Sequence, residues 1–376
     1  MEIAWFTDTW LPNRDGVVTS LLMFKNAIEK KGHKIYVFAP GDRNKEEGDI
    51  FYYKSKVFSP YPQYKFPSFF SVFSMRTRKI IKKIEPDIIH SHSPGIMGIH
   101  ALIASGKFNV PLIFTFHTFV DDSVYMLFKN EKMQQMAKKF FYKWLRYYCK
   151  KCSCVIAPSH YVAERISKMC QKHIEVIPTG IDLNRFEKGD GNRIREKYHG
   201  KKIILHVGRV VKEKNISLLI DAAPYILKKM DAIFIIVGEG PARKELEKEA
   251  ERKGVAEHFF FTGFVSDEEL ADYYKAADVF VFPSLYETQG IVAFEAMAAG
   301  VPVVAADAKA LPDFIKDGEN GYLANPYDAR HFAEKIIMAL ENREIVKKAR
   351  EFVEQYSIEK MADKLLKIYE KYEGQM

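Results

Sequence analysis

The sequence predicts an α/β protein built from two Rossmann-like domains, each with a parallel sheet. Short apolar runs typical of buried strands alternate along the chain with longer segments of helical periodicity, the order expected of βαβ units. The chain has 376 residues. A single hydrophobic core rarely serves a chain of that length, so two domains are expected.

The expected strands fall into two groups along the chain. The first group lies at residues 2–7, 34–39, 87–90, 111–116 and 153–157, and the second at 174–177, 202–207, 232–237, 258–262, 278–282 and 302–305. The segment Pro178–Phe186 is rich in turn residues and is expected to link two domains. The predicted domains are therefore 1–177 and 178–355, followed by a C-terminal helix within 356–376.

Two features of the first domain follow strands. Asp15 and Gly16 come after the first strand and precede a helix expected at Leu21–Lys31. Glycine permits close approach of a ligand to the backbone, and Asp15 could either orient a substrate hydroxyl or cap the turn. His117 emerges at the end of the fourth strand, at the edge where open α/β sheets bind ligands.

The most informative segment of the second domain follows the strand at 278–282. Glu287 lies in the polar loop after this strand, Gly290 opens a short helix, and Glu295 lies inside that helix. A helix N-terminus presents free N–H groups to phosphate, and carboxylates accept hydrogen bonds from sugar hydroxyls. The segment therefore offers partners for a sugar linked to a diphosphate.

A second segment strengthens this interpretation. Gly208 and Arg209 directly follow the strand at 202–207, and Lys214 lies just before the next helical stretch. Arginine binds phosphate with two parallel hydrogen bonds and lysine binds it as a point charge. Each segment alone could be an ordinary charged loop, but together they indicate a phosphate site at the carboxyl edge of one sheet.

These motifs resemble those of the retaining GT-B glycosyltransferases of family four, which use nucleotide sugars without a metal. The resemblance covers nearly the whole chain and implies two domains facing across a cleft, with the last helix crossing back to the first domain. It implies that Glu287 faces the transferred sugar, that Glu295 holds the ribose, and that Arg209 and Lys214 clamp the diphosphate. The donor-binding residues implied are Gly16, Arg209, Lys214, Glu287, Gln289, Gly290, Ile291, Val292 and Glu295.

The first domain is similar to lipid-directed members of this family, including diacylglycerol glycosyltransferases. The run Thr115-Phe-His117-Thr118 resembles their Thr-x-His-Thr element and implies that His117 contacts the donor sugar near the reacting centre. Asp121, Asp122 and Tyr125 follow where such enzymes place acidic and aromatic residues, so they are predicted, with Asp15, to contact the acceptor. The nearby His90 and His92 are interpreted as architectural.

The net positive charge of the chain comes from its first half. Residues 1–175 hold 27 lysines and arginines against 15 aspartates and glutamates, whereas the whole chain has a net charge of +8. Residues 66–83 and 132–151 combine aromatic side chains with lysines and arginines at helical spacing, which favours an anionic membrane surface, although each could be an ordinary helix with one face in the core. A lipid acceptor such as diacylglycerol is therefore predicted, with a soluble molecule or a growing oligosaccharide as alternatives.

Other classes of protein are less compatible with the sequence. No zinc-finger, helix-turn-helix or RRM-like signature indicates nucleic acid, no Asp-x-Asp indicates a metal-dependent transferase, and no Gly-x-Gly-x-x-Gly follows the first strand as in a dehydrogenase. A nucleotide-sugar-binding protein without activity would not need the Arg209 and Lys214 clamp. No apolar run approaches the roughly 18 residues of a membrane span and no signal-peptide pattern opens the chain, so a cytoplasmic enzyme is expected, peripheral on the membrane face if its acceptor is a lipid.

Four residues have the spacing of metal ligands. They form the pairs Cys149-x-x-Cys152 and Cys170-x-x-His173. Because Cys152 also stands at the start of an expected strand, small buried thiols are the competing interpretation. No metal or other cofactor is assigned, and a nucleotide diphosphate sugar is expected as the co-substrate.

Overall fold

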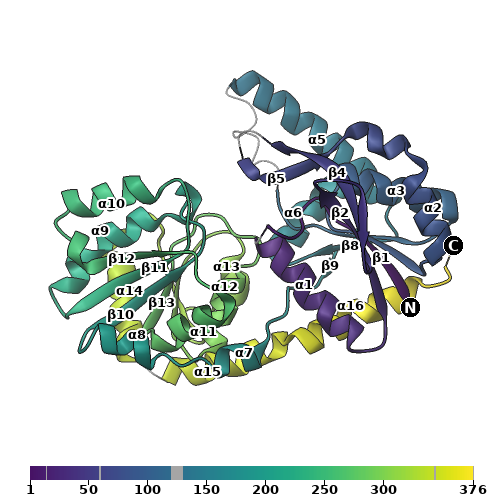
Figure 1. Cartoon of the computed structure of the whole chain (residues 1–376). Coiled ribbons are helices and arrows are strands. Elements are labelled where there is room, and N and C mark those ends of the chain that lie inside the picture. The colour runs from purple at the N-terminus through teal and green to yellow at the C-terminus, as the bar shows by residue number, and fades with distance from the viewer. Residues whose placement is uncertain (14, 59–60, 120–129, 343, 376) are drawn as a thin grey trace. The chain divides into compact units, whose positions relative to one another are not determined.

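The computed structural model describes residues 1–13, 15–58, 61–119, 130–342 and 344–375. The chain divides into two compact units (Figure 1). Unit 1 comprises Met1–Gly180 together with Ile358–Met376, and unit 2 comprises Ile181–Ser357. Each unit has its own largely parallel sheet covered by helices, which confirms the predicted fold class.

The sheet of unit 1 has the order β3-β4-β2-β1-β6-β7-β8-β9, with β5 paired to β4 outside this path. Its strands are β1 (Glu2–Phe6), β2 (Lys34–Gly41), β3 (Lys45–Glu47), β4 (Ile50–Phe58), β5 (Tyr61–Pro67), β6 (Ile88–Ser91), β7 (Leu112–Thr115), β8 (Cys154–Ala157) and β9 (Glu175–Val176). All neighbours are parallel except β3 and β5, which run antiparallel to β4. Strands β6, β7 and β8 are buried along their whole length, as expected of parallel strands covered on both faces.

Strands β3, β4 and β5 form an arm at one edge of this sheet that the sequence analysis did not predict. The sequences of β4 and β5 mix aromatic residues with lysines, and β5 contains Pro62 near its start and Pro67 at its end. Proline weakens a strand assignment because it cannot donate to the sheet, although it is tolerated at an edge. The arm is an edge of this kind, which explains why the pattern was missed.

The helices of unit 1 cover both faces of its sheet. They are α1 (Gly16–Glu29), α2 (Met75–Ile84), α3 (Ile96–Phe108), α5 (Glu131–Lys151), α6 (His160–Cys170) and α16 (Ile358–Tyr372), with a 3-10 helix η1 at Phe69–Phe73. Helix α1 begins five residues before the start predicted at Leu21, because Asp15 already caps its first turn: Asp15 Oδ1 accepts hydrogen bonds from the N–H groups of Val17 and Val18 at 3.0 and 2.9 Å.

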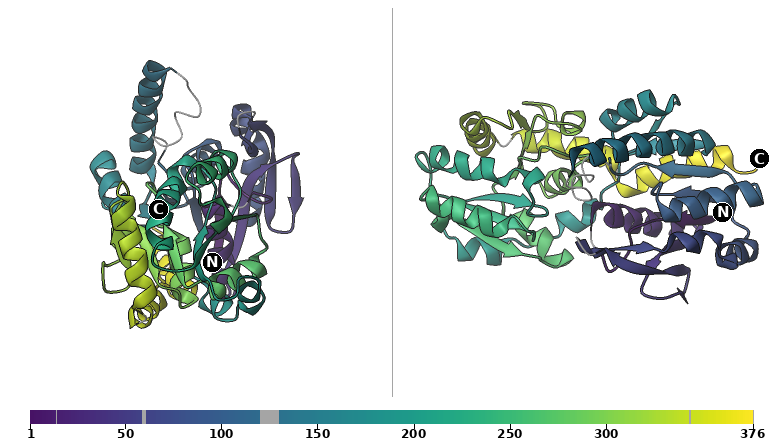
Figure 2. Two further views of the ribbon diagram at one scale, coloured as in Figure 1. Left: turned by 90° about the vertical axis from the view of Figure 1, so that its left-hand side faces the viewer. Right: turned by 90° about the horizontal axis from the view of Figure 1, so that it is seen from above.

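Helix α16 belongs to unit 1 although it comes last in the chain. It packs beside α1 (Figures 1 and 2), and Lys31 Nζ lies 2.8 Å from Asp363 Oδ1 across this contact. On its inner side the Tyr369 hydroxyl accepts a hydrogen bond from Trp5 Nε1 at 3.2 Å and lies 2.6 Å from His90 Nδ1. These buried bonds connect α16 directly to β1 and β6.

Unit 2 is a six-stranded parallel sheet in the order β12-β11-β10-β13-β14-β15. Its strands are β10 (Lys202–Val207), β11 (Ala232–Val237), β12 (Phe259–Gly263), β13 (Val279–Phe282), β14 (Val303–Ala306) and β15 (Tyr322–Ala324). Its helices are α7 (Leu183–Glu187), α8 (Asn192–Lys197), α9 (Ile216–Leu227), α10 (Arg243–Arg252), α11 (Asp267–Ala276), α12 (Ile291–Ala298), α13 (Leu311–Phe314), α14 (Ala329–Glu341) and α15 (Glu344–Val353), with 3-10 helices at Lys212–Lys214 (η3), Ala256–His258 (η4) and Glu354–Tyr356 (η5).

The core of unit 2 lies on both faces of this sheet. On one face, side chains such as Ile204 and Phe234 pack with α9, α10 and α14 in one buried cluster. On the other face Phe280 contacts Tyr274 of α11, with ring centroids 5.6 Å apart. Since β10 and β13 are adjacent and central, the loops that leave their carboxyl ends emerge side by side.

Candidate functional site

The two charged segments of unit 2 predicted from the sequence meet in the structure. One is the loop after β10 that ends in η3, and the other is the loop after β13 that leads to α12. The N–H of Leu285 donates to the carbonyl of Glu213 at 2.9 Å, and the Ser284 hydroxyl donates to the same carbonyl at 3.3 Å. These bonds fix the two loops against each other at one edge of the sheet.

Lys214 and Glu287 form an ion pair where these loops meet. Lys214 Nζ donates to Glu287 Oε1, and the two side chains are only 15% and 13% exposed. The ammonium group also lies 5.4 Å from the centre of the Phe282 ring, at the end of β13. Shielding from water strengthens such a pair, so the carboxylate of Glu287 has a fixed position.

Arg209 stands at the rim of the same site. Its side chain is 53% exposed, and its Nη2 lies 3.7 Å from Glu213 Oε1. A surface pair of this length is weak. The guanidinium is therefore accessible to an anionic ligand, unlike the enclosed ammonium of Lys214.

Helix α12 begins at the end of the Glu287 loop with Gly290 as its N-cap. Gly290 has a φ of +89°, and a Cβ there would lie 2.8 Å from Phe282 Cε1 and 2.9 Å from Leu311 Cδ2. Only glycine meets both requirements without strain. The N–H of Ala293 donates to the carbonyl of Gly290 at 3.0 Å. The N–H groups of Ile291 and Val292, in the first turn, have no acceptor within the helix and form a potential anion site.

Glu295 lies inside α12 and is buried. The hydroxyl of Tyr274 donates to Glu295 Oε2 at 2.8 Å, and burial raises the pKa of the Glu295 carboxyl. Gln289 is also buried, whereas Ile291 and Val292 are half-buried. The structure thus gathers all the predicted donor residues of unit 2 around two loops and one helix start, and their contacts with a ligand stay predictions.

His206 was not among the predicted site residues, although it lies beneath the site at the end of β10. Its Nδ1 lies 3.0 Å from the carbonyl of Val281, while its Nε2 is buried and has no hydrogen-bond partner in the described structure. Burial lowers its pKa to about 4, so the ring is neutral near pH 7. The sequence offers one signal for this residue, a histidine among the apolar residues of the strand.

In unit 1, Asp15 and Gly16 lie where the loop after β1 enters α1. Asp15 caps α1, and its Oδ2 accepts a hydrogen bond from the Thr9 hydroxyl at 3.1 Å. A Cβ at Gly16 would meet nothing within 4 Å. The capping interpretation of Asp15 therefore has a structural basis, and a contact with the acceptor stays a prediction.

His117 follows β7 and lies beside the two histidines of β6. His117 Nε2 lies 3.2 Å from His92 Nδ1, and the rings of His92 and His90 are centred 4.0 Å apart. His90 in turn is held by Tyr369 and by Thr115, whose Oγ1 lies 2.8 Å from His90 Nε2. His92 therefore contacts His117, which is predicted to contact the donor sugar near the reacting centre, and its assignment as architectural did not anticipate this contact.

This histidine cluster borders a small cavity of about 20 Å³, enough for one water molecule. His92 Nε2 is buried and, in the described structure, lacks a hydrogen-bond partner. Burial lowers the pKa of all three rings, that of His117 to about 4. All three rings are thus neutral near pH 7. A neutral imidazole ring can donate a hydrogen bond from one nitrogen and accept one at the other.

Three of the predicted acceptor residues, Asp121, Asp122 and Tyr125, lie outside the described residues. A carboxylate that sequence reasoning missed, Asp8, follows β1. It accepts hydrogen bonds from the Ser93 hydroxyl and, at 2.9 Å, from the N–H of Met97. Asp8 thus caps the start of α3, a role that no local pattern around residue 8 reveals.

The four cysteines are free and buried. Among the residues that the structure describes, no group of three or more His, Cys, Asp or Glu could hold a metal ion. His173, the fourth member of the predicted spacing, has a side chain that is 83% exposed and lies 3.6 Å from Glu175. Burial raises the pKa of Cys154 to about 11, the behaviour of a small buried thiol.

Comparisons with known proteins define the class to which this fold and site belong. Residues 190–360 match the family model for glycosyl transferases group 1, and residues 14–185 match that for glycosyltransferase family 4. The chain is similar to a sucrose-phosphate synthase from Thermosynechococcus elongatus, with a TM-score of 0.80, 22% identity and 98% of each chain covered. It is also similar to WaaG, a glycosyltransferase involved in lipopolysaccharide biosynthesis, with a TM-score of 0.71 and 15% identity over 98% of this chain and 99% of that one. Its two α/β units thus have the GT-B fold.

Curated sequences place the chain within this class. It is 31% identical to the alpha-monoglucosyldiacylglycerol synthase of Streptococcus pneumoniae over 90% of this chain and 78% of that one. It is 30% identical to the protein of the same name from Acholeplasma laidlawii over 92% and 90% of the two chains. The chain therefore belongs to the group 1, or family 4, glycosyltransferases.

Proposed function

We propose that the protein is a retaining hexosyltransferase that moves a hexose from a nucleotide diphosphate sugar to a lipid hydroxyl, such as that of diacylglycerol. UDP-glucose is the expected donor. The observation that carries this proposal is the enclosed Lys214–Glu287 pair beside the N-terminus of α12. The names of the two synthases support the lipid acceptor. A solved relative of 19% identity, Alr3699/HepE from Anabaena in complex with UDP-glucose, supports the donor.

The donor site would act by electrostatic preorganisation. Lys214, Arg209 and the free N–H groups of α12 would stabilise charge on the leaving diphosphate as the bond between the sugar carbon and the phosphate oxygen breaks. Glu287 would hold the hydroxyls of the sugar. Glu295 would hold the ribose through its carboxyl group.

Transfer with retention requires the acceptor oxygen to bond to the anomeric carbon on the face that the diphosphate leaves. In the proposed reaction the departing phosphate accepts the proton of the acceptor hydroxyl. No protein nucleophile and no metal ion is assigned to this step. His117, neutral near pH 7, is proposed to contact the hydroxyls of the donor sugar.

The surface of unit 1 supports a membrane acceptor. On α5 the exposed apolar side chains Met133, Met136, Phe140 and Tyr147 share one side of the helix with several lysines, whereas Trp144 turns inward and donates to the carbonyl of Pro94 at 2.7 Å. Helix α5 is labelled in Figure 1. Basic helices with an exposed apolar face bind anionic interfaces.

A second exposed apolar group lies nearby in unit 1. Phe69, Phe70 and Phe73 of η1 are exposed, and α2 follows with its lysines and arginines. Both η1 and α5 contact α3: Ser71 Oγ lies 3.0 Å from His100 Nε2, and the Tyr148 hydroxyl donates to the carbonyl of Gly98 at 3.0 Å. No helix in the described residues is long and apolar enough to cross a membrane, so the proposed association is with the membrane surface.

The test is to incubate the purified protein with a panel of nucleotide sugars, with and without vesicles that contain diacylglycerol and anionic lipid. Release of nucleoside diphosphate that requires both one donor and the vesicles is the expected result. Equal release with a soluble sugar or polyol and no vesicles would overturn the lipid acceptor. Binding of a nucleotide sugar without any turnover would instead identify a binding protein.

A further inference from the structure

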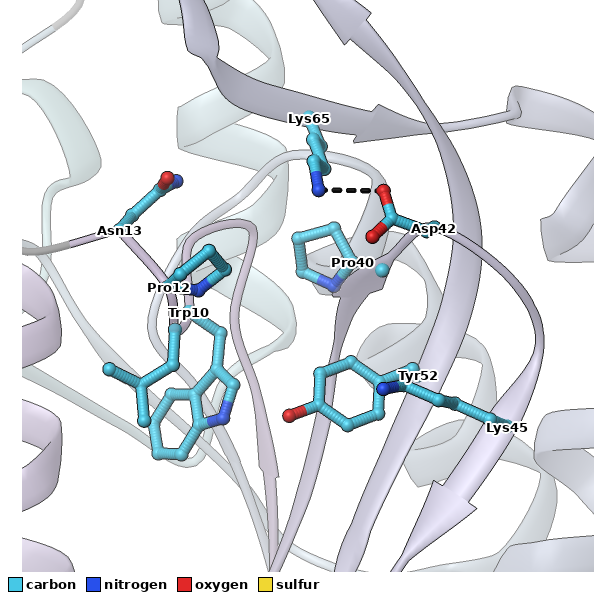
Figure 3. A pocket seen from close by; sticks show the side chains of 10 residues that line it. Trp10, Pro12, Asn13, Pro40, Asp42, Lys45, Tyr52 and Lys65 are labelled. Carbon is cyan, nitrogen blue, oxygen red and sulfur yellow. Dashed lines mark hydrogen bonds and ion pairs between the residues drawn. The ribbon is translucent and has the colours of Figure 1, made fainter.

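Arg209 has a tightly held backbone but a loosely held side chain. Its side chain is 53% exposed, and its Nη2 lies 3.7 Å from Glu213 Oε1. Figure 3 shows the opposite case in unit 1, where Lys65 Nζ lies 2.7 Å from Asp42 Oδ1 and the charged group itself is held. The position of the Arg209 guanidinium therefore depends on the backbone that carries it.

The backbone on both sides of Arg209 is bonded to the loop that follows β11, residues 238–242, and to the last residue of β11. The N–H of Gly208 donates to the carbonyl of Val237 at 3.0 Å, and the N–H of Val210 donates to the carbonyl of Glu239 at 2.9 Å. These bonds continue the parallel pairing of β10 with β11 beyond the ends of both strands. Arg209 is therefore fixed to β11 from either side.

Gly240 allows this loop to approach Val210 closely. A Cβ at Gly240 would lie 2.1 Å from the carbonyl oxygen of Val210 and 2.6 Å from its carbonyl carbon. The same oxygen accepts a hydrogen bond from the N–H of Ala242 at 3.1 Å. Any larger residue at position 240 would therefore displace Val210, the neighbour of Arg209 in the chain.

Gly238 allows the same approach on the other side of Arg209. It has a φ of +131°, and a Cβ there would lie 2.0 Å from the carbonyl oxygen of Gly208 and 2.9 Å from its carbonyl carbon. The carbonyl of Gly208 thus points toward Gly238. Because C=O and N–H point in opposite directions in a trans peptide, the N–H of Arg209 points away from β11. That is the side of β10 on which β13 and the Glu287 loop lie.

The loop after β11 is itself held by the next strand of the sheet. The N–H of Gly238 donates to the carbonyl of Gly263, at the end of β12, at 2.9 Å. Arg243 Nη1 lies 2.8 Å from Glu239 Oε1, and Arg243 Nη2 donates to the carbonyl of Phe261 at 3.2 Å. The loop is thus a fixed support between β12 and the residues around Arg209.

We propose that the loop after β11 positions Arg209 for the leaving diphosphate, and that Gly238 and Gly240 are its positioning residues. The inference rests on the proposed function, in which Arg209 binds the diphosphate. A guanidinium that is held through its backbone keeps its N–H groups available for two parallel hydrogen bonds to phosphate. Because the backbone is fixed before the ligand arrives, less conformational freedom is lost on binding.

The test is calorimetric titration of the full chain with UDP in a double-mutant cycle. Arg209→Met should weaken UDP binding about tenfold or more, since it removes a charged donor from the phosphate. Gly240→Ala should weaken it about fivefold or more in the parent protein, but less than about twofold when residue 209 is already Met. A loop that merely supported the fold would cost the same factor in both backgrounds.

Gly191→Ala is the matched control. A Cβ at Gly191 would lie 2.5 Å from the backbone nitrogen of Ala276, a comparable overlap. Ala276 ends α11, just before the amino end of β13, whereas Arg209 follows the carboxyl end of β10. This variant should therefore bind UDP within about twofold of the parent protein, and chemical denaturation shows whether each variant folds.

Arg243→Lys is a second variant that disturbs the loop without adding an atom to its backbone. It keeps the positive charge, but an ammonium group cannot hold Glu239 and Phe261 in the fork geometry of a guanidinium. It takes the place of Gly240→Ala in the cycle if that variant does not fold. It should then weaken UDP binding only while Arg209 is present.

The outcomes separate this inference from the proposed function. An equal cost of the loop variant with and without Arg209, or no cost in the parent protein, would overturn the positioning role and leave the donor site intact. A parent protein that does not bind UDP, or an Arg209→Met variant that binds it as tightly as the parent, would overturn the donor site and the inference with it.

Discussion

At the scale of single residues, the contact between Lys214 and Glu287 links two parts of the sequence that were interpreted separately. Each residue alone could have been an ordinary surface charge. In the structure their side chains are paired and largely shielded from water. A charge that is fixed before the ligand arrives needs little reorganisation during the reaction, which is the basis of electrostatic catalysis.

Replacement of Lys214 tests this role. Lys214→Met should lower kcat by about 10²-fold or more, because it removes a cation from the leaving diphosphate, and Glu287→Ala should lower turnover to a similar degree. Lys212→Met is the control, since Lys212 is an exposed lysine of the same 3-10 helix. Steady-state rates of nucleoside diphosphate release provide the measurement, and a Lys214→Met enzyme with near-normal kcat would contradict the site assignment.

The residues that sequence reasoning missed are those whose partners come from distant elements. Tyr274 holds Glu295, and His92 contacts His117. In both cases the partner is set by how a helix or strand packs, and no local spacing encodes it. Glu287, Gly290 and Arg209 could be recognised because each lies in a short motif at the end of a strand.

At the scale of elements, the start of α12 depends on one backbone geometry. Gly290 has a positive φ and is in close contact with Phe282 and Leu311. The loop that carries Glu287 therefore enters the helix along a path open only to glycine. The sequence predicted this helix start, because a glycine stood between a polar loop and a run of small residues.

Gly290→Ala should destabilise unit 2 by about 2–4 kcal/mol, the sum of left-handed backbone strain and overpacking. It should also weaken nucleotide binding, because the N–H groups of α12 would shift. Chemical denaturation and nucleotide titration measure the two effects. Gly106→Ala, at a helical position of α3 where a Cβ meets nothing within 4 Å, is the control and should be neutral or slightly stabilising; equal effects of the two substitutions would contradict the prediction.

The exposed side of α5 is the element-scale test of membrane association. Replacing Met136 and Phe140, which are 71% and 75% exposed, by serine should lower vesicle binding at least about tenfold, since each buried apolar side chain contributes roughly 1.5–3 kcal/mol. Co-sedimentation with anionic vesicles is the measurement. Tyr327→Ser, at an 81% exposed position of unit 2, should have no effect, and unchanged sedimentation of the α5 variant would rule out this surface.

The three strands of the edge arm of unit 1 could not be predicted from the sequence. The buried central strands were predicted within a few residues, because continuous apolar runs bounded by turns identify them. The arm lies at the edge of the sheet and contains prolines, so its composition resembles that of a loop. Its pairing with β2 is a long-range contact that only the assembled sheet provides.

At the scale of the whole molecule, buried histidines make unit 1 sensitive to acid. Burial lowers the pKa of His100 and of His117 to about 4, and that of His90 and His92 well below its usual range. A histidine whose pKa is lower in the folded than in the unfolded state binds fewer protons when folded. Its contribution to stability is therefore complete above about pH 6.5 and is lost as the pH falls toward 4.

We expect the free energy of unfolding of unit 1 to fall by roughly 1.4 kcal/mol per such histidine between pH 7.5 and 5.5. All three tryptophans lie in unit 1, so their fluorescence in urea reports this unit. His100→Gln should reduce the slope of stability against pH, whatever its effect at pH 7.5. The raised pKa of Asp8 acts in the opposite direction. Its contribution is the same in the parent protein and in His100→Gln, so comparing the two removes it. An equal slope of stability against pH in both proteins would contradict the prediction.

The position of α16 has a consequence for how the protein is made. Unit 2 is one continuous stretch of chain, whereas unit 1 needs Ile358–Tyr372 to cover Trp5 and His90. At about 5–20 residues per second, a ribosome spends roughly ten to thirty-five seconds on the stretch between the two parts of unit 1. Unit 2 can thus fold during translation, before the ribosome has synthesised the helix that completes unit 1.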